Sequence, residues 1–132
     1  MIQAEQILNT VSMIQRENLD VRAVTMGISL LDCRGATIAE TCNQIRAKIT
    51  HCAANLVATC DTVGEQYAVP VVNKRIAVTP ISEVGAGYTV AEFVQIAQAL
   101  DEATAEVGCD LIGGYSANVE CGISRADAAL IE

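Results

Sequence analysis

The chain has 132 residues, of which 52% are hydrophobic and 18% are charged, and this size and composition suit one folded domain and exclude a disordered protein. It carries 8 basic and 16 acidic residues, and because the basic residues are scattered along the sequence, no nucleic-acid surface is expected. Only 3% of the residues are aromatic, so the core must be built from aliphatic side chains.

The first predicted element is an amphipathic helix over residues 3–17, in which apolar residues recur every three or four positions. These apolar residues are Ala4, Ile7, Leu8, Val11 and Ile14. Residues 21–28 are mostly apolar and rich in β-branched side chains. They predict a strand that is covered on both faces and ends near Ser29.

A capping box of Thr37 and Glu40 predicts the start of a long helix that reaches about Asp61. The apolar stripe of this helix contains Cys42 and Cys60, which we expect to be buried. Along one straight helix these two cysteines would be about 27 Å apart, too far to share a metal ion. His51, the only histidine, falls on the polar side, and Gly64 is expected to end the helix.

Pro70 and Pro80 bracket a segment that predicts one strand, or two strands with a break at residues 73–75. A loop over residues 81–88 then leads to a second capping box. That box begins at Thr89 and predicts a helix that runs to about Val107.

Gly108 is expected to stop this helix, and residues 109–114 predict a short buried strand. A last short helix is expected from Ser124 to the end. The alternation of helices and strands predicts an α/β fold with a mostly parallel sheet and flanking helices. Because no linker or repeat interrupts the sequence, residues 1–132 are interpreted as a single domain.

No stretch approaches the roughly 20 apolar residues of a membrane span, and the first ten residues lack the pattern of a signal peptide. We therefore expect a cytoplasmic protein that does not bind a membrane. Its six cysteines form no CxxC motif and are expected to be reduced. The sequence predicts no metal site and names no cofactor.

Polar residues gather after each predicted strand, where ligands collect in parallel sheets. The first cluster holds Asp32, Cys33 and Arg34, just before a helix N-terminus. Arg34 and the helix dipole should lower the pKa of the Cys33 thiol, whereas Asp32 opposes them. Cys33 is thus a candidate nucleophile or redox group with Asp32 beside it, and the alternative is a half-buried loop cysteine.

The second cluster comprises Asn73, Lys74, Arg75, Thr79 and Ser82. Lys74 or Arg75 could bind a carboxylate or phosphate. Neighbours in a strand point to opposite faces, however, so both cannot easily hold one ligand. The alternative for these cations is an ion pair with one of the many carboxylates.

The third cluster contains Gly113, Gly114 and Ser116. It offers backbone amides and polar side chains, and its glycines would let the chain approach a ligand closely. Gly-Gly is also ordinary turn chemistry, which is the alternative reading.

Four segments, residues 26–33, 53–58, 71–81 and 110–117, together resemble the N-terminal part of an uncharacterised bacterial and archaeal family often labelled pyruvate formate-lyase-like. The resemblance implies a fold similar to the α/β barrel of the glycyl radical enzymes, and no established reaction. Members of that family are several times longer, so the chain would correspond to about the first third of a barrel. Gly114 and Tyr115 lack the context of a glycyl radical site.

A partial barrel has open sheet edges and an uncovered inner face, so we expect self-association or a second chain that completes it. Two functions follow from this reading. One is a barrel enzyme acting on a small anionic metabolite with Cys33 and an anion-binding Lys74 or Arg75. The other is a non-catalytic metabolite-binding, regulatory or structural subunit.

Overall fold

The computed structural model describes residues 3–17, 21–120 and 122–132. Its elements are α1 (Ala4–Glu17), β1 (Val21–Ile28), the 3-10 helix η1 (Leu31–Cys33), α2 (Ile38–Ala53), α3 (Leu56–Tyr67), β2 (Val71–Val78), α4 (Ile81–Val84), α5 (Val90–Glu106), β3 (Leu111–Gly113) and α6 (Arg125–Ile131). Cys121 lies outside the described residues. The predicted alternation of helices and strands is present, and the 81–88 segment, predicted as a loop, contains the short helix α4.

The three strands form a parallel sheet in the order β1-β2-β3, which confirms the predicted α/β fold. The sheet is open, because β1 and β3 do not pair with each other. Strand β2 is continuous, and Pro70 and Pro80 lie just outside it, where their missing N–H groups cost no ladder hydrogen bond.

The predicted long helix is wrong in its extent, because two helices, α2 and α3, replace it with a break at Ala54 and Asn55. Asn55 adopts φ −109° and ψ 3°, which interrupts the helical geometry. The break lets α2 pack along α5 while α3 packs along β2. The spacing calculated for Cys42 and Cys60 on one straight helix therefore does not apply.

The prediction that Gly64 ends the helix is wrong, because α3 continues to Tyr67. Ala68 ends it in the left-handed conformation, with φ 54°, and its amide donates to the carbonyl of Glu65. A Cβ at position 64 would lie 3.1 Å from the carbonyl oxygen of Val69. Gly64 thus permits the chain to fold back closely on the helix rather than ending it.

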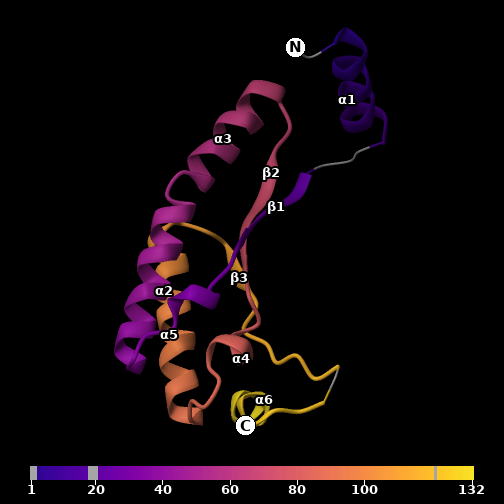
Figure 1. Ribbon diagram of the computed structural model, residues 1–132. Coiled ribbons are helices and arrows are strands. Elements are labelled where there is room, and N and C mark those ends of the chain that lie inside the picture. Colours follow the sequence, from indigo (N-terminus) through magenta and orange to yellow (C-terminus); the bar gives the residue numbers. More distant parts are fainter. Residues whose placement is uncertain (1–2, 18–20, 121) are drawn as a thin grey trace.

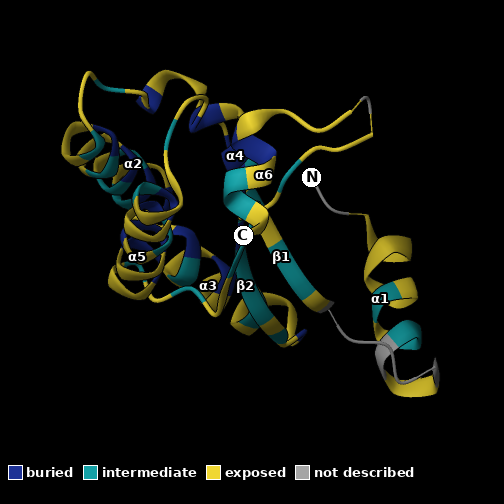
Figure 2. Cartoon of the chain, turned by 90° about the horizontal axis from the view of Figure 1, so that it is seen from below, coloured by how far each residue is buried: buried dark blue, intermediate teal, exposed yellow. Residues whose placement is uncertain are grey.

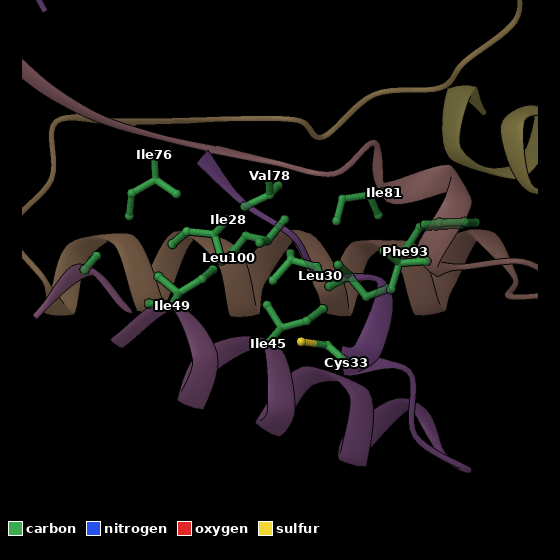
Figure 3. Packing of buried hydrophobic residues seen from close by; sticks show 14 of the residues in the cluster. Ile28, Leu30, Cys33, Ile45, Ile49, Ile76, Val78, Ile81, Phe93 and Leu100 are labelled. Carbon is green, nitrogen blue, oxygen red and sulfur yellow. The ribbon is translucent and has the colours of Figure 1, made fainter. Parts of the chain in front are cut away.

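The hydrophobic core lies between one face of the sheet and the helices α2, α3 and α5 (Figures 1 and 3). It is built mainly from aliphatic side chains, as the composition predicted. Its labelled members in Figure 3 are Ile28, Leu30, Cys33, Ile45, Ile49, Ile76, Val78, Ile81, Phe93 and Leu100.

The opposite face of the sheet has no helix over its central part, and we call it the helix-free face (Figure 1). Because strand side chains alternate and Ile28, Ile76 and Val78 point into the core, the alternate residues form this face. They are Ala23, Thr25 and Gly27 of β1, Asn73, Arg75 and Ala77 of β2, and Leu111 and Gly113 of β3. The prediction that residues 21–28 form a strand covered on both faces is therefore wrong for this part of the sheet.

Helix α1 forms as predicted, but its apolar stripe is not buried by the rest of the chain (Figure 2). The side chains of Ile7 and Leu8 are 51% and 68% exposed. Amphipathic periodicity thus predicts the helix correctly without showing what covers it.

Candidate functional site

The carboxyl ends of the three strands meet, as the positions of the polar clusters predicted. After β1, the Leu30 amide donates to Thr79 Oγ1 at 3.2 Å. After β2, the Ile81 amide donates to the Gly114 carbonyl at 3.0 Å, and the Ser82 amide reaches the Ser116 carbonyl at 3.4 Å. The carboxyl end of the sheet therefore holds Thr79, Ser82, Gly114 and Ser116. Thr79 is held through its hydroxyl and the others through backbone hydrogen bonds.

Ser82 is buried at that end and supports the last helix. Its side chain contributes to the lowered pKa of Asp127, a residue that is 5% exposed. The Asp127 carboxylate also accepts from the Ser124 amide at 2.9 Å, the Ser124 hydroxyl at 2.6 Å and the Asn118 amide at 3.2 Å. These donors, led by Ser124, lower the pKa of Asp127 to about 2. Asp127 was not singled out from the sequence, although Ser124 followed three residues later by an acid is a capping-box signal.

Cys33, the predicted reactive thiol, points into the core. Cys33 is 3% exposed, and Figure 3 shows its sulfur directed toward Ile45. Burial raises the pKa of the Cys33 thiol, and the negative charge of Asp32 raises it further, so the predicted lowering of this pKa is wrong. A protonated, buried thiol is a poor nucleophile.

Asp32 is exposed and forms an ion pair with Lys48 of α2, which lowers the pKa of its carboxyl group. Cys33 Sγ lies 3.8 Å from the same carboxylate. Asp32 thus anchors η1 to α2 through Lys48. This contact was not predicted from the sequence.

Arg34 reaches away from Cys33, toward the loop before α5. Its Nη2 donates to the Ala86 carbonyl at 2.6 Å, and its guanidinium lies 5.4 Å from the ring centre of Tyr88. The Tyr88 hydroxyl is 2.7 Å from Thr41 Oγ1. Arg34 is thereby linked to the 85–88 loop and not to the Cys33 thiol.

Asn73, Lys74 and Arg75 lie within β2 and not at its carboxyl end. Asn73 Nδ2 donates to the Arg22 carbonyl at 3.0 Å. Lys74 Nζ pairs with Asp61 of α3 at 3.0 Å, and this carboxylate raises the pKa of Lys74. The ion-pair alternative is therefore confirmed for Lys74, which the alternation of the strand separates from Arg75.

Arg75 occupies the middle strand on the helix-free face. Thr25 of β1 and Leu111 of β3 are in register with it on either side. Its Nε is buried and has no hydrogen-bond partner among the described residues, and no ion pair between described residues includes it. A buried donor of a charged group without a partner is costly.

The next row toward the strand ends carries almost no side-chain volume. Gly27, Ala77 and Gly113 are in register there, and a Cβ added to either glycine would have no atom within 4 Å. Space is thus left on the sheet beside Arg75. Thr25, Gly27 and Ala77 were missed from the sequence, although the small residues at alternate positions of both strands are a signal that could have found them.

Gly113 and Gly114 have different roles. Gly113 ends β3 on the helix-free face, whereas Gly114 has φ +112° and a Cβ there would clash with the Val78 carbonyl oxygen. The Ser116 hydroxyl is 3.5 Å from the Gly114 carbonyl. The turn alternative accounts for Gly114, and the backbone hydrogen bonds described above occupy its carbonyl.

Within residues 3–17, 21–120 and 122–132, no group of three or more histidine, cysteine or acidic side chains is arranged to hold a metal ion. In the same part of the chain, no helix has both the length and the apolar character needed to cross a membrane. His51 is exposed and Cys60 is buried, as expected, whereas Cys42 is only partly buried. Cys52 is exposed.

Comparison with known proteins places these observations in a family. The family described as "Uncharacterised ACR (DUF711)" matches residues 12–132. UPF0210 proteins of Oleidesulfovibrio alaskensis and Lacticaseibacillus paracasei are 44% and 46% identical over 132 and 131 residues, or 100% and 99% of this chain. A UPF0210 protein of Streptococcus pneumoniae is 47% identical over 126 residues, or 96% of the chain. The chain spans 28–29% of the length of these relatives.

Proposed function

The chain belongs to the DUF711 family, and we propose that it forms the first part of a larger α/β barrel in which Arg75 binds a small carboxylate or phosphate on the inner wall. The observation that carries this function is the partnerless Nε of Arg75 on the helix-free face. An oxyanion would supply the acceptor that the described residues do not.

The arrangement of helices supports the barrel. Helices α2 and α3 of the first crossover and α5 of the second lie on the same face of the sheet (Figure 1), and the strands follow in sequence order. An open doubly wound sheet has helices on both faces, whereas a barrel has them only outside. The pyruvate formate-lyase-like barrel suggested by the sequence motifs is compatible with this one-sided winding.

The composition of the inner wall supports a ligand chamber. The interior of a packed barrel is filled by bulky branched residues. Here the helix-free face instead carries Gly27, Ala77 and Gly113 beside Arg75. A ligand of a few carbon atoms would fit on this row with its anionic group on the guanidinium, which can bind an oxyanion through two parallel hydrogen bonds.

The geometry favours anion binding over the thiol mechanism. Cys33 lies on the core side, and its pKa is raised by burial, so Arg75 and the Cys33 thiol do not face one ligand. The longer relatives contribute the remaining residues of the barrel, and those residues would decide between an enzyme and a metabolite-binding subunit. A catalytic role for Cys33 and Asp32 stays a prediction.

Anion binding can be tested by calorimetry with inorganic phosphate, acetate and succinate as probes. The protein would be the chain joined to the part of the Oleidesulfovibrio alaskensis relative that lies outside the match. Arg75→Gln should weaken binding of the best probe by at least about tenfold, equivalent to about 1.4 kcal/mol. The matched control Arg22→Gln, at an exposed position of β1, should bind like the parent. Equal binding by parent and Arg75→Gln, or binding of none of the three anions, would contradict the proposal.

A further inference from the structure

Strand β3 lies at an edge of the sheet. It pairs with β2 through residues 111–113, and no described strand pairs with its other side. A free edge of this kind presents backbone N–H and C=O groups that can accept a further strand. We call this side of residues 111–113 the β3 edge.

The surroundings of the β3 edge are apolar. Leu111 and Tyr115 are 53% and 41% exposed, and Val119 and Ile123 in the following segment are also exposed. A hollow of about 160 Å³ lies between β3 and α5, lined by Ala97, Leu100, Asp101, Ile112 and Tyr115. The hollow has room for about one large apolar side chain next to the edge.

The other edge of the sheet, along β1, is different in character. Arg22, Thr25 and Gly27 are exposed there. Charged and small polar residues at an edge discourage the addition of a strand. The two edges therefore favour strand addition at β3.

The direction of winding agrees with this choice. Strand β2 was added beside β1, and β3 beside β2, each after helices on the same face. Parallel connections keep one hand in nearly all sheets, so the next strand of the family sequence would be added at the β3 edge. The relatives offer the material, because the chain spans only 28–29% of their length.

We propose that a parallel strand from the part of the family sequence beyond this chain pairs with the β3 edge and places an apolar side chain in the hollow lined by Ala97. A second copy of the chain fits less well. A symmetric dimer would pair the three-residue β3 with itself in antiparallel fashion, and it would bring together two chains that each carry a net charge of −8. This inference rests on the partial barrel of the proposed function, and it does not depend on anion binding by Arg75.

The test mixes the chain with the separately produced remainder of the Oleidesulfovibrio alaskensis relative. Light scattering gives the stoichiometry, and hydrogen exchange followed by mass spectrometry locates the contact. We expect a one-to-one complex in which amides of residues 111–115 become protected.

Two pairs of variants separate the edge from general surface effects. Ala97→Leu fills the hollow, and Ala105→Leu makes the same change at an exposed site of the same helix. Leu111→Lys places a charge at the β3 edge, and Val94→Lys introduces the same side chain at a similarly exposed position of α5. The first member of each pair should weaken the complex by at least about tenfold and the second by less than about twofold. Circular dichroism checks that every variant is folded.

Three results would overturn the inference. They are the absence of a complex, protection along β1 instead of β3, and a homodimer that protects residues 111–115 without the remainder. Equal weakening by the edge variants and their controls would also overturn the assignment of the hollow.

Discussion

Cys33 shows at the scale of one residue how neighbours in sequence can mislead. The flanking Asp32 and Arg34 suggested an activated thiol, but Arg34 turns to Ala86 and Tyr88 and Asp32 pairs with Lys48. The thiol is left in the core, where burial raises its pKa. Adjacency in the sequence places Asp32 and Arg34 beside Cys33 along the chain, but it does not show in which direction each side chain points.

The cysteines should therefore differ sharply in reactivity. Iodoacetamide at neutral pH should label the exposed Cys52 first, and the buried Cys33 and Cys60 should react only as fast as the structure opens. Peptide mass spectrometry over a time course measures the order. Labelling of Cys33 ahead of Cys52 would restore the reactive-thiol hypothesis, and the urea-unfolded chain serves as the control in which all react.

Asp127 should make the stability of the chain depend on pH. Its pKa is about 2 in the folded protein and about 3.9 in an unfolded chain. Because the folded value is the lower one, its stabilisation is fully present above about pH 4 and is lost as the pH falls through about 2. Asp127→Asn should lower the melting temperature at pH 7 and flatten its dependence between pH 4 and 2. The exposed Asp101→Asn is the control, and an unchanged melting temperature for Asp127→Asn would contradict this role.

At the scale of elements, local signals located most helices and strands. The capping box at Thr37 and Glu40 is present, with hydrogen bonds of 3.2 and 3.3 Å between each backbone amide and the other side chain. The break between α2 and α3 was not foreseen, because it serves packing on two different partners, α5 and β2. The periodicity of apolar residues shows which face of a helix is buried, but it does not show that two successive helices pack on different partners.

Gly114 should be required by the turn that follows β3. An alanine there would meet both a positive φ of 112° and the backbone of Val78, and strain of this kind costs about 1–3 kcal/mol. Gly114→Ala should therefore lower the urea midpoint of unfolding. Gly27→Ala, where the new Cβ has no atom within 4 Å, should not lower it. An equal loss of stability in both variants would contradict a special requirement for glycine at position 114.

At the scale of the whole molecule, the residue patterns predicted the parallel sheet and its element order, but its one-sided covering was implied only by the resemblance to a partial barrel. The apolar strand at residues 21–28 suggested helices on both faces, whereas Thr25 and Gly27 are exposed. The polar residues of β2 were recognised from the sequence. Lys74 is ion-paired, whereas the Nε of Arg75 has no hydrogen-bond partner in the described part of the chain. This difference became visible only when the sheet showed which face each residue occupies.

The central claim is that the helix-free face becomes the wall of a chamber in the complete family protein. Cysteine accessibility at Gly27→Cys measures this most directly, with the chain alone compared with the chain joined to the remainder of the Oleidesulfovibrio alaskensis relative. A small methanethiosulfonate and a bulky maleimide should both label the chain alone. In the joined protein, the small reagent should still react, while the bulky reagent should be slowed by at least about tenfold, as expected for an enclosed pocket. Unchanged labelling by both reagents, or protection from both, would contradict the chamber.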